Sequence, residues 1–359
     1  MTSGHDVADA RLHRVSAGLL RAGLSVEVLG LGLAEDAPEG LTARVRPRPG
    51  LAGRALLALL LPWQAHGATL FVLDPDALLG ARLATLIRRR RLVADVHEDY
   101  AALVLDRPWA RGAAGRIAAL MVGVATSVAR RCDLTVVADD HVPPLQARRR
   151  LVVRNEPDPR LLPSEVAASE SPRAVYVGDV RRTRGLAAML ETMEHAPEWT
   201  LDVIGPVAAA DQAWLAQRLA ERPDLSARLR WHGRLTPRRS WEVAAGAWAG
   251  FCLLEPTAAF VDAVPSKLYE YLAAGIVPVV SDLPRQAQLV REAGSGVVVV
   301  DAAGAAAALA AIAGDPSERL RASAAGRSWA VGEGEGEGGG GGGTAYDRLA
   351  AAVLEVSRG

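Results

Sequence analysis

The stretch 265–282, PSKLYEYLAAGIVPVVSD, holds the only lysine in the chain, Lys267. The other residues that carry a fixed positive charge are arginines. A lysine offers a compact ammonium on a flexible stem, whereas arginine offers a planar guanidinium. A lone lysine among arginines therefore indicates a site that needs a point charge.

The residues around Lys267 predict a helix start. Pro265 disfavours helix at the residue before it, and Ser266 is expected to cap a helix that ends at Gly275. The amides of Lys267, Leu268 and the next residue would then lack carbonyl partners in their own helix. Such amides and a nearby positive charge favour a phosphate group.

Two carboxylates accompany this helix start. Glu270 lies one turn beyond Ser266, where it can accept hydrogen bonds from two vicinal hydroxyls, such as those of a ribose. The alternative is a first-turn glutamate that the helix dipole favours. Asp262 lies eight residues before Glu270, on the preceding loop.

This pattern resembles the C-terminal signature of GT-B glycosyltransferases of the large family-4 group. That signature has two acids separated by seven residues and a run E-A/Y-x-A-x-G-x-P-V-V, matched here by Asp262, Glu270 and YLAAGIVPVVSD. The first acid is Asp instead of Glu, AVPSKLY replaces the glycine-rich loop as in the PSK/PNK subgroup, and one extra residue precedes Pro278. The resemblance implies catalytic roles for Asp262 and Glu270, and donor contacts from Pro265, Ser266, Lys267 and Leu268.

Segment 175–193, VYVGDVRRTRGLAAMLETM, is similar to the strand, glycine loop and helix start that bind the donor in this family. Gly178 allows a close approach of backbone to ligand. Arg184 stands where the family has a phosphate-binding lysine. The family's arginine after the glycine is Asp179 here, so Arg181 or Arg182 is expected to replace it; a solvated arginine cluster is the alternative.

Two later strand ends extend the resemblance. LDVIGP ends at Gly205-Pro206, and WHGRLTP contains Gly233, Arg234 and Leu235. In the family, the second of these loops lies against the nucleotide base. The resemblance therefore implies that Gly205, Gly233, Arg234 and Leu235 bind the donor.

The N-terminal half resembles the same family. LVADVHEDY places His97 and Glu98 at a strand end, LDPDALL resembles the family's D-P-E-L-L element, and GHDVADAR resembles its first loop. The resemblance implies that His97 is catalytic, by bonding a donor sugar hydroxyl or polarising the acceptor side. It also implies that Gly4, Asp9, Arg11 and Glu98 face the diphosphate or acceptor. The alternative for His97 is a structural histidine.

The spacing of apolar segments predicts an α/β protein. Strands are expected at 25–30, 69–74, 92–96 and 134–138, and then at 174–178, 201–205, 229–233, 250–254, 277–281 and 296–300, with helices between most of them. Such alternation indicates parallel sheets covered on both faces. Two doubly wound domains are predicted, with ligands at the carboxyl ends of their strands and a cleft between them.

The predicted organisation has four parts. These are an acceptor domain at 1–155, a nucleotide-sugar domain at 156–331, a Gly/Glu linker at 332–343 and a C-terminal helix at 344–359. The polar stretch 155–173 reads as the interdomain connection. The first helix, at 9–22, follows a short polar lead, so the opening strand of the first domain is missing, as a late start-site assignment would explain.

The composition of the chain limits the classes of partner and the cellular compartment that we expect. The 359 residues have a formal net charge of zero, which argues against a nucleic-acid partner. Cys132 and Cys252 indicate buried thiols of a reducing compartment, and no signal core precedes the first domain. The apolar runs 56–61 and 117–129 are read as too short to span a bilayer, so a cytoplasmic protein is expected. Arginine clusters at 88–91 and 148–150 either dock on an anionic membrane surface or close helix C-termini.

The resemblance implies sugar transfer from a nucleotide-diphosphate sugar to the hydroxyl of a glycan or lipid-linked acceptor in cell-surface polysaccharide or glycolipid synthesis. Retention of configuration, no cofactor and no metal are expected, since Lys267 and Arg184 can stabilise the diphosphate. Three alternatives remain open: a degenerate nucleotide-sugar-binding protein, an epimerase, and a phosphorylase carrying pyridoxal phosphate on Lys267.

Overall fold

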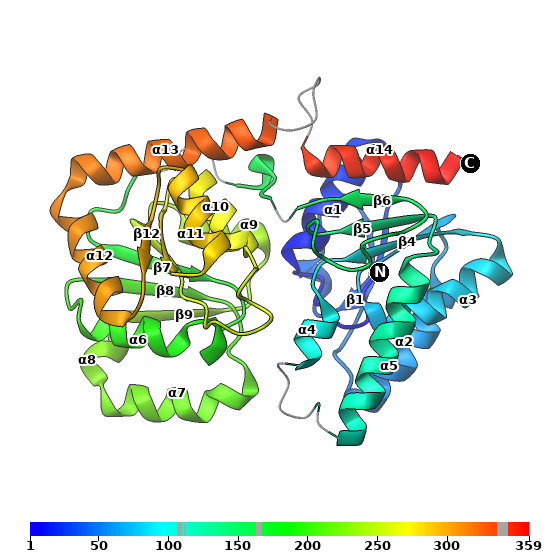
Figure 1. Ribbon diagram of the computed structural model, residues 1–359, viewed down its shortest axis with the longest axis horizontal. Coiled ribbons are helices and arrows are strands. Elements are labelled where there is room, and N and C mark those ends of the chain that lie inside the picture. The colour runs from blue at the N-terminus through cyan, green and yellow to red at the C-terminus, as the bar shows by residue number, and fades with distance from the viewer. Residues whose placement is uncertain (106–109, 111, 155, 163–166, 336–343, 359) are drawn as a thin grey trace. The chain divides into compact units, whose positions relative to one another are not determined.

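The computed structural model describes the chain except for residues 106–109, 111, 155, 163–166, 336–343 and 359. The chain forms two compact units (Figure 1). Unit 1 contains Met1–Glu156 and Gly341–Gly359, and unit 2 contains Pro157–Gly340. The last helix therefore belongs to the unit that begins the chain.

Unit 1 contains two parallel sheets. Its two-stranded sheet pairs β1 with β2, and its four-stranded sheet has the order β3-β4-β5-β6. The strands are β1 (Glu27–Leu31), β2 (Thr42–Arg46), β3 (Thr69–Val72), β4 (Arg91–Val96), β5 (Leu134–Val137) and β6 (Arg150–Val152). β2 and β6 were not predicted, because their alternating arginines and short length hide the apolar signal of a strand.

The first two residues connect these two sheets. The Thr2 amide donates to the Leu29 carbonyl of β1 at 2.9 Å, and the Met1 carbonyl accepts from the Leu73 amide, just after β3, at 3.1 Å. Met1 and Thr2 thus lie where the opening strand of a doubly wound sheet would stand. Among the described residues, β1 is the first strand, as the polar lead of the sequence predicts.

Helices cover both faces of the four-stranded sheet in unit 1. One face packs against α1 (Ala10–Arg21) and α14 (Ala345–Arg358), which also contact each other. The opposite face packs against α2 (Leu51–Gln64), α3 (Leu78–Arg88) and α5 (Gly112–Ala129). The short helices η1 (Ala34–Asp36), η2 (Pro75–Ala77) and α4 (Tyr100–Leu105) lie in connections.

Unit 2 has one parallel sheet of order β12-β11-β10-β7-β8-β9 (Figure 1). Its strands are β7 (Arg173–Val177), β8 (Thr200–Ile204), β9 (Leu229–Gly233), β10 (Ala249–Cys252), β11 (Val277–Ser281) and β12 (Val297–Val299). The order runs outward in both directions from β7 and β10. This is the doubly wound arrangement that the strand–helix alternation predicts.

Both faces of the unit 2 sheet are covered as well. One face packs against α6 (Leu186–Glu194), α7 (Ala209–Glu221), α8 (Pro223–Ser226) and α12 (Ala302–Gly314). The other packs against α9 (Pro237–Ala244), α10 (Ser266–Ala274) and α11 (Pro284–Glu292). The connections contain η3 (Pro159–Leu161) and η4 (Arg182–Arg184), and α13 (Pro316–Glu335) contacts α10.

Two sequence expectations differ from the structure. α13 continues to Glu335, so the helix extends into the part of the sequence read as a linker, 332–343. The rest of that segment lies outside the described residues. The helix α5 is long and apolar enough to cross a membrane by length and composition, unlike the shorter apolar run within it, and it is the one such helix in the described part of the chain. The preceding residues 112–116, GAAGR, lengthen the helix and add only one charged residue.

Candidate functional site

The first candidate site lies in unit 2, at the carboxyl ends of β7 and β10. The strand order changes direction between these two strands, and ligands of doubly wound sheets bind at such a position. Gly178 follows β7 directly, and α10, which carries Lys267, follows β10. The sheet topology therefore brings together two segments that are far apart in sequence.

The loops after β7 and β8 pack too closely for side chains. Gly178 has φ of +129°, and Gly205 has φ of +142°, a region that glycine adopts far more readily than other residues. A Cβ atom on Gly205 would lie 1.9 Å from the Gly178 carbonyl oxygen. The Gly205 amide also donates to the Gly233 carbonyl at 2.7 Å, which continues the same edge to β9. The three predicted donor-binding glycines thus line one edge of the sheet.

Lys267 is buried beneath this edge, with only 6% of its surface exposed. Its Nζ atom lies 3.5 Å from the centroid of the Tyr176 ring, and it has no hydrogen-bond partner among the described residues. A Cβ atom on Gly178 would lie 3.2 Å from Nζ, so a side chain at this position would crowd the ammonium. A buried cation without a hydrogen-bonded anion is costly, which favours an anionic ligand here.

The electrostatics of Lys267 agree with this interpretation. Burial lowers the pKa of Lys267 from 10.5 to about 7; the Cys252 side chain opposes the shift, and Arg184 adds to it. Asp179 and Glu270 also favour the charged form, but they do not offset the burial. A ligand phosphate would supply the missing negative charge and raise this pKa.

The start of α10 differs in detail from the prediction. Ser266 is the first helical residue, and the extended Pro265 takes the cap position without a side-chain hydrogen bond. The Leu268 amide donates to the Pro265 carbonyl at 3.0 Å, so it is not a free donor as predicted. The amides of Ser266 and Lys267 remain the first-turn amides that have no carbonyl within their own helix. The positive end of the helix dipole lies beside the ammonium.

The arginines of the η4 segment separate into different environments. Arg184 lies with its guanidinium carbon 5.7 Å from the centroid of the Phe260 ring, and its Nε has no hydrogen-bond partner in the described part of the chain. Arg182 instead donates from Nε to Asp211 at 2.8 Å, which directs it toward α7. Of the two residues expected to complete the phosphate clamp, Arg182 thus pairs with α7, whereas Arg181 stays beside the loop after β7, where it pairs with Asp179.

Asp179 joins two of the predicted donor-binding arginines. Its carboxylate lies 3.3 Å from Arg181 and 3.5 Å from Arg234, measured to the guanidinium nitrogens. Arg234 follows the β9 edge, and Leu235 beside it packs against the core below. The ion pair between Asp179 and Arg234 thereby connects the loop after β7 to the loop after β9.

The two predicted carboxylates have different surroundings. Glu270 is buried on α10, and its charge acts on Lys267. Asp262 is exposed on the preceding turn, where its backbone carbonyl accepts a hydrogen bond from Arg285 at 2.9 Å. The structure thus groups Glu270 with Lys267, and it connects Asp262 to α11.

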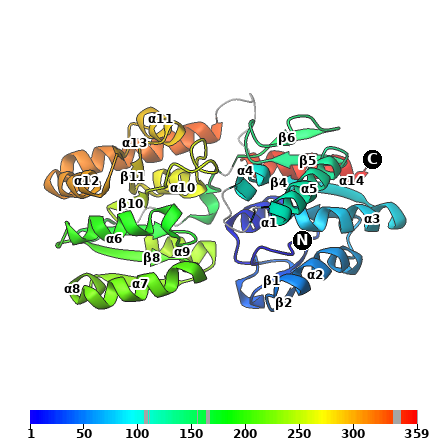
Figure 2. The ribbon, with the colours of Figure 1, turned by 60° about the horizontal axis from the view of Figure 1, so that its bottom comes forward.

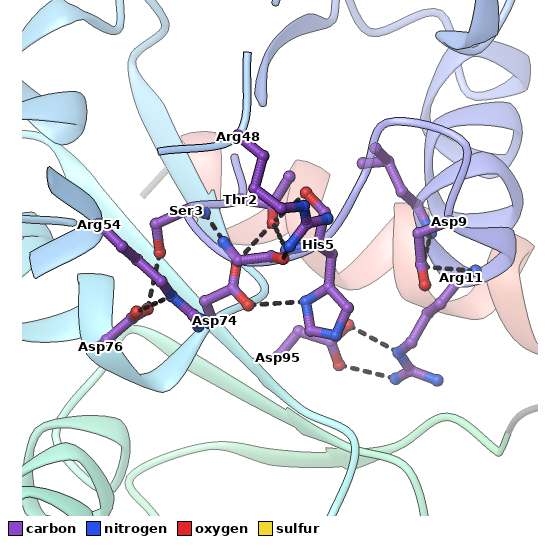
Figure 3. A network of polar contacts seen from close by, with 12 residues as sticks. Thr2, Ser3, His5, Asp9, Arg11, Arg48, Arg54, Asp74, Asp76 and Asp95 are labelled. Atoms are coloured by element: carbon purple, nitrogen blue, oxygen red, sulfur yellow. Dashed lines mark hydrogen bonds and ion pairs between the residues drawn. The ribbon is translucent and has the colours of Figure 1, made fainter. Parts of the chain in front are cut away.

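A second candidate site lies in unit 1 around Asp74, at the carboxyl end of β3 (Figure 3). One oxygen of this buried carboxylate accepts hydrogen bonds from the Thr2 hydroxyl at 2.5 Å, the Ser3 amide at 2.8 Å and the Gly4 amide at 3.1 Å. The other oxygen lies 2.6 Å from Nδ1 of His5. Asp74 therefore fixes the N-terminal loop and orients His5.

The pKa values of His5 and His97 are shifted in opposite directions. Although burial opposes protonation, the Asp74 carboxylate raises the pKa of His5 to about 9. Burial, together with the charge of His5, lowers the pKa of His97. The two rings lie 4.9 Å apart, and the His97 Nδ1 and the Tyr100 hydroxyl have no hydrogen-bond partner among the described residues. A cationic histidine thus lies beside two buried polar atoms that a ligand could satisfy.

Asp9 and Arg11, both predicted in the first loop, have structural roles in unit 1. Asp9 caps α1 by accepting from the amides of Arg11 and Leu12 at 2.9 and 3.0 Å. Arg11 is buried, and its guanidinium binds both oxygens of Asp95 at 2.7 Å, so it does not face a ligand as predicted. Glu98 is half-buried after β4. Sequence reasoning missed His5, although it follows Gly4 directly and Asp74 lies in the quoted LDPDALL motif.

Comparison with known proteins gives a family match and a fold. The family model described as "Glycosyl transferases group 1" matches residues 159–329, which lie within unit 2. Sucrose-phosphate synthase from Thermosynechococcus elongatus superposes with a TM-score of 0.68 at 14% identity, covering 97% of this chain and 92% of that chain. The fold is GT-B.

Further GT-B structures agree with this result. Anabaena HepE in complex with UDP-glucose has a TM-score of 0.63 at 12% identity, with 92% of this chain and 99% of that chain covered. WaaG, a glycosyltransferase involved in lipopolysaccharide biosynthesis, has a TM-score of 0.61 at 13% identity, with coverages of 88% and 90%. No curated protein sequence matches the chain at a significant level. The predicted α/β GT-B fold class is confirmed.

Proposed function

We propose that the protein is a glycosyltransferase that moves a sugar from a nucleotide-diphosphate sugar to an acceptor hydroxyl. The single observation that carries this proposal is Lys267 at the start of α10, a buried ammonium to which no described residue offers a hydrogen-bonded anion. The group 1 glycosyl transferase match over residues 159–329 includes this site. Of that group, the family-4 type with the PSK/PNK signature fits the sequence best.

In the proposed reaction, the protein accelerates sugar transfer by stabilising the negative charge of the leaving diphosphate. The bond from the anomeric carbon to the phosphate oxygen breaks, a bond to the acceptor oxygen forms, and the acceptor proton leaves with the nucleoside diphosphate. Negative charge develops on that diphosphate, where Lys267, Arg184 and the first amides of α10 can stabilise it. These groups support a metal-independent transfer, and the resemblance of the sequence to the family-4 type supports retention of configuration.

The other parts of the donor have proposed positions within unit 2. Glu270 would accept hydrogen bonds from the ribose hydroxyls, since it is buried within the same helix as Lys267. Arg234 and Leu235, after β9, would flank the base. HepE binds UDP-glucose, and an Escherichia coli structure described as trehalose-6-phosphate contains UDP-2-fluoro glucose, so UDP-sugars are the first donors to test.

Unit 1 is the proposed acceptor unit. The protonated His5 and the neutral His97 would contact an acceptor that offers hydroxyl or anionic oxygens, with Gly4 and Glu98 nearby in sequence. A glycan or lipid-linked acceptor of cell-surface polysaccharide or glycolipid synthesis fits these groups. We place the protein in the cytoplasm, peripheral to the inner face of an anionic membrane.

A thermal-shift screen against UDP-, GDP-, ADP- and TDP-sugars tests the donor site, because a ligand that binds only the native state raises the melting temperature. One donor should stabilise the protein, and Lys267→Ala and Glu270→Ala should abolish that shift. Transfer or donor hydrolysis by the wild type, lost in Glu270→Ala, supports the enzyme. Binding without either reaction identifies a nucleotide-sugar-binding protein instead, and activity unchanged by both substitutions contradicts the assigned site.

A further inference from the structure

Three helices of unit 1 expose apolar side chains at helical spacing. On α2 these are Leu56, Leu59 and Leu60; on α3 they are Leu79, Leu83, Leu86 and Ile87; on α5 they are Ile117, Leu120, Met121 and Val124. Ile87 is 70% exposed and Leu120 is 69% exposed. A surface helix of a globular protein normally turns such a stripe toward the core. These helices carry a second apolar stripe on the outer side.

The three outer stripes belong to one surface, which we call the α2/α3/α5 face. The inner residues of the same helices, such as Ala58, Ala81 and Ala125, pack in one core cluster against the four-stranded sheet. α3 contacts both α2 and α5, and a Cβ atom on Gly80 would lie 2.9 Å from the Ala58 carbonyl oxygen. Figures 1 and 2 show the three helices side by side. Their outer sides therefore form a continuous layer.

The charges of this face have one sign. None of the three helices contains aspartate or glutamate, whereas α3 carries Arg82 and Arg88 and α5 carries Arg116. Arg88 lies with its guanidinium carbon 5.7 Å from the centroid of the Trp63 ring, at the end of α2. Tryptophan and arginine at the edge of an apolar surface are typical of the boundary between lipid headgroups and acyl chains.

We propose that the α2/α3/α5 face docks on an anionic lipid bilayer, with its leucine, isoleucine and methionine side chains inserted below the headgroups. This inference deepens the membrane contact of the proposed function, by naming the surface that makes it, and it does not depend on the donor site. Charge complementarity favours lipid over a second copy, since two such faces would bring arginines against arginines without a carboxylate.

The packing of α5 favours docking over spanning. Its length and composition would allow it to cross a bilayer, but Ala125 and Ala129 are buried against the sheet of unit 1. A helix that packs on a folded sheet along one side can enter the bilayer only with its other side. The cluster 148–150, expected as a second lipid contact, does not belong to this face: Arg150 is in β6 and Arg149 pairs with Glu355 on α14.

Sedimentation of the full-length protein with vesicles tests the proposal. Vesicles of phosphatidylcholine mixed with phosphatidylglycerol should bind the wild type, and pure phosphatidylcholine should bind it about tenfold more weakly. The double variant Ile87→Glu, Leu120→Glu should lose at least about tenfold in affinity for the mixed vesicles, because it places charge in the apolar layer. Arg88→Gln with Arg116→Gln should remove only the preference for anionic lipid.

The matched control is Leu320→Glu, which changes a leucine of similar exposure on α13 of unit 2 and should bind vesicles as the wild type does. Unchanged melting temperatures would show that all variants fold. Sedimentation velocity gives the competing outcome: a dimer that Ile87→Glu, Leu120→Glu converts to a monomer, without vesicle binding by the wild type, overturns the proposal. Donor-induced stabilisation measured on the same variants separates this outcome from a failure of the proposed function.

Discussion

The ammonium of Lys267 lies on the face of the Tyr176 ring, 3.5 Å from its centroid. The ring belongs to β7 and the lysine to α10, which follows β10 in the chain, so this contact connects one central strand of the unit 2 sheet to the helix that follows the other. A cation–π contact partly compensates a buried cation but leaves its hydrogen-bonding capacity unused. Lys267 is therefore positioned before a ligand arrives, and the protein bears the cost of its burial.

Replacing Lys267 with methionine should stabilise the folded protein at pH 7. The pKa of Lys267 is lowered to about 7, so the unfolded chain binds this proton more tightly than the native state. The free energy of unfolding of the wild type should consequently rise as the pH increases from about 7 to 10.5, whereas Lys267→Met lacks this increase. Urea unfolding at several pH values measures the free energy of unfolding of both proteins. The difference between Lys267→Met and the wild type should shrink toward high pH. A constant difference would contradict the lowered pKa.

Donor affinity should weaken as the pH rises above about 7. The diphosphate favours the charged form of Lys267, and that form must be created by proton uptake once the free site is neutral. Isothermal titration calorimetry in buffers of different ionisation enthalpy should detect this uptake. Lys267→Arg keeps its charge throughout and serves as the control, whose affinity should be nearly independent of pH. Parallel pH profiles for the two proteins would exclude Lys267 as the titrating group.

Glu270 and Asp262 should differ in their effect on donor binding. Glu270→Gln should weaken affinity by roughly tenfold to hundredfold, as expected for lost hydrogen bonds to a charged acceptor. Asp262→Asn should change it by less than about threefold, since the side chain is exposed and Arg285 binds the backbone carbonyl. Donor titration of both variants decides the point. A larger loss in Asp262→Asn would restore the equal roles that the sequence pattern implies.

The ion pair between His5 and Asp74 should make stability depend on pH. The pKa of His5 is raised from 6.5 to about 9, so its stabilising contribution is complete below pH 6.5 and disappears as the pH rises through about 9. Because 35% of the His5 side chain is exposed, solvent screening should limit this gain to about 1 kcal/mol. His5→Gln should lose it in chemical unfolding at pH 6, and the exposed His195→Gln should not. Equal destabilisation at pH 6 and pH 10 would show that the pair contributes no charge term.

The sequence predicted the sheets of this protein better than it predicted the sites. Apolar runs marked ten strands, because a buried parallel strand must be apolar on both faces. β2 and β6 were not predicted, because arginines alternate along β2 and because β6 has only three residues. The helix start at Lys267 was predicted from Pro265 and Gly275, although the cap shifted by one residue because Pro265 itself takes the extended position.

Side-chain partners were harder to predict because they depend on contacts between distant segments. Arg11 matched a family motif, yet Asp95, far along the chain, holds it in the core. His5 lay beside a quoted glycine, but only the fold reveals Asp74 next to it. The apolar run 117–129 was visible in the sequence, whereas the exposure of its outer side requires the packing of α5 on the sheet.

The return of α14 to unit 1 has a consequence for biosynthesis. Tyr346, Leu349 and Val353 of this helix cover the core made by Val15, Val93 and Val136, and all of unit 2 is translated between the two sets. Unit 1 therefore leaves the ribosome with one face of its sheet covered by α1 alone, and it completes this core only after unit 2 has been made. A chain shortened before α14 should accumulate with chaperones or in inclusion bodies, even though it would contain the whole of unit 2.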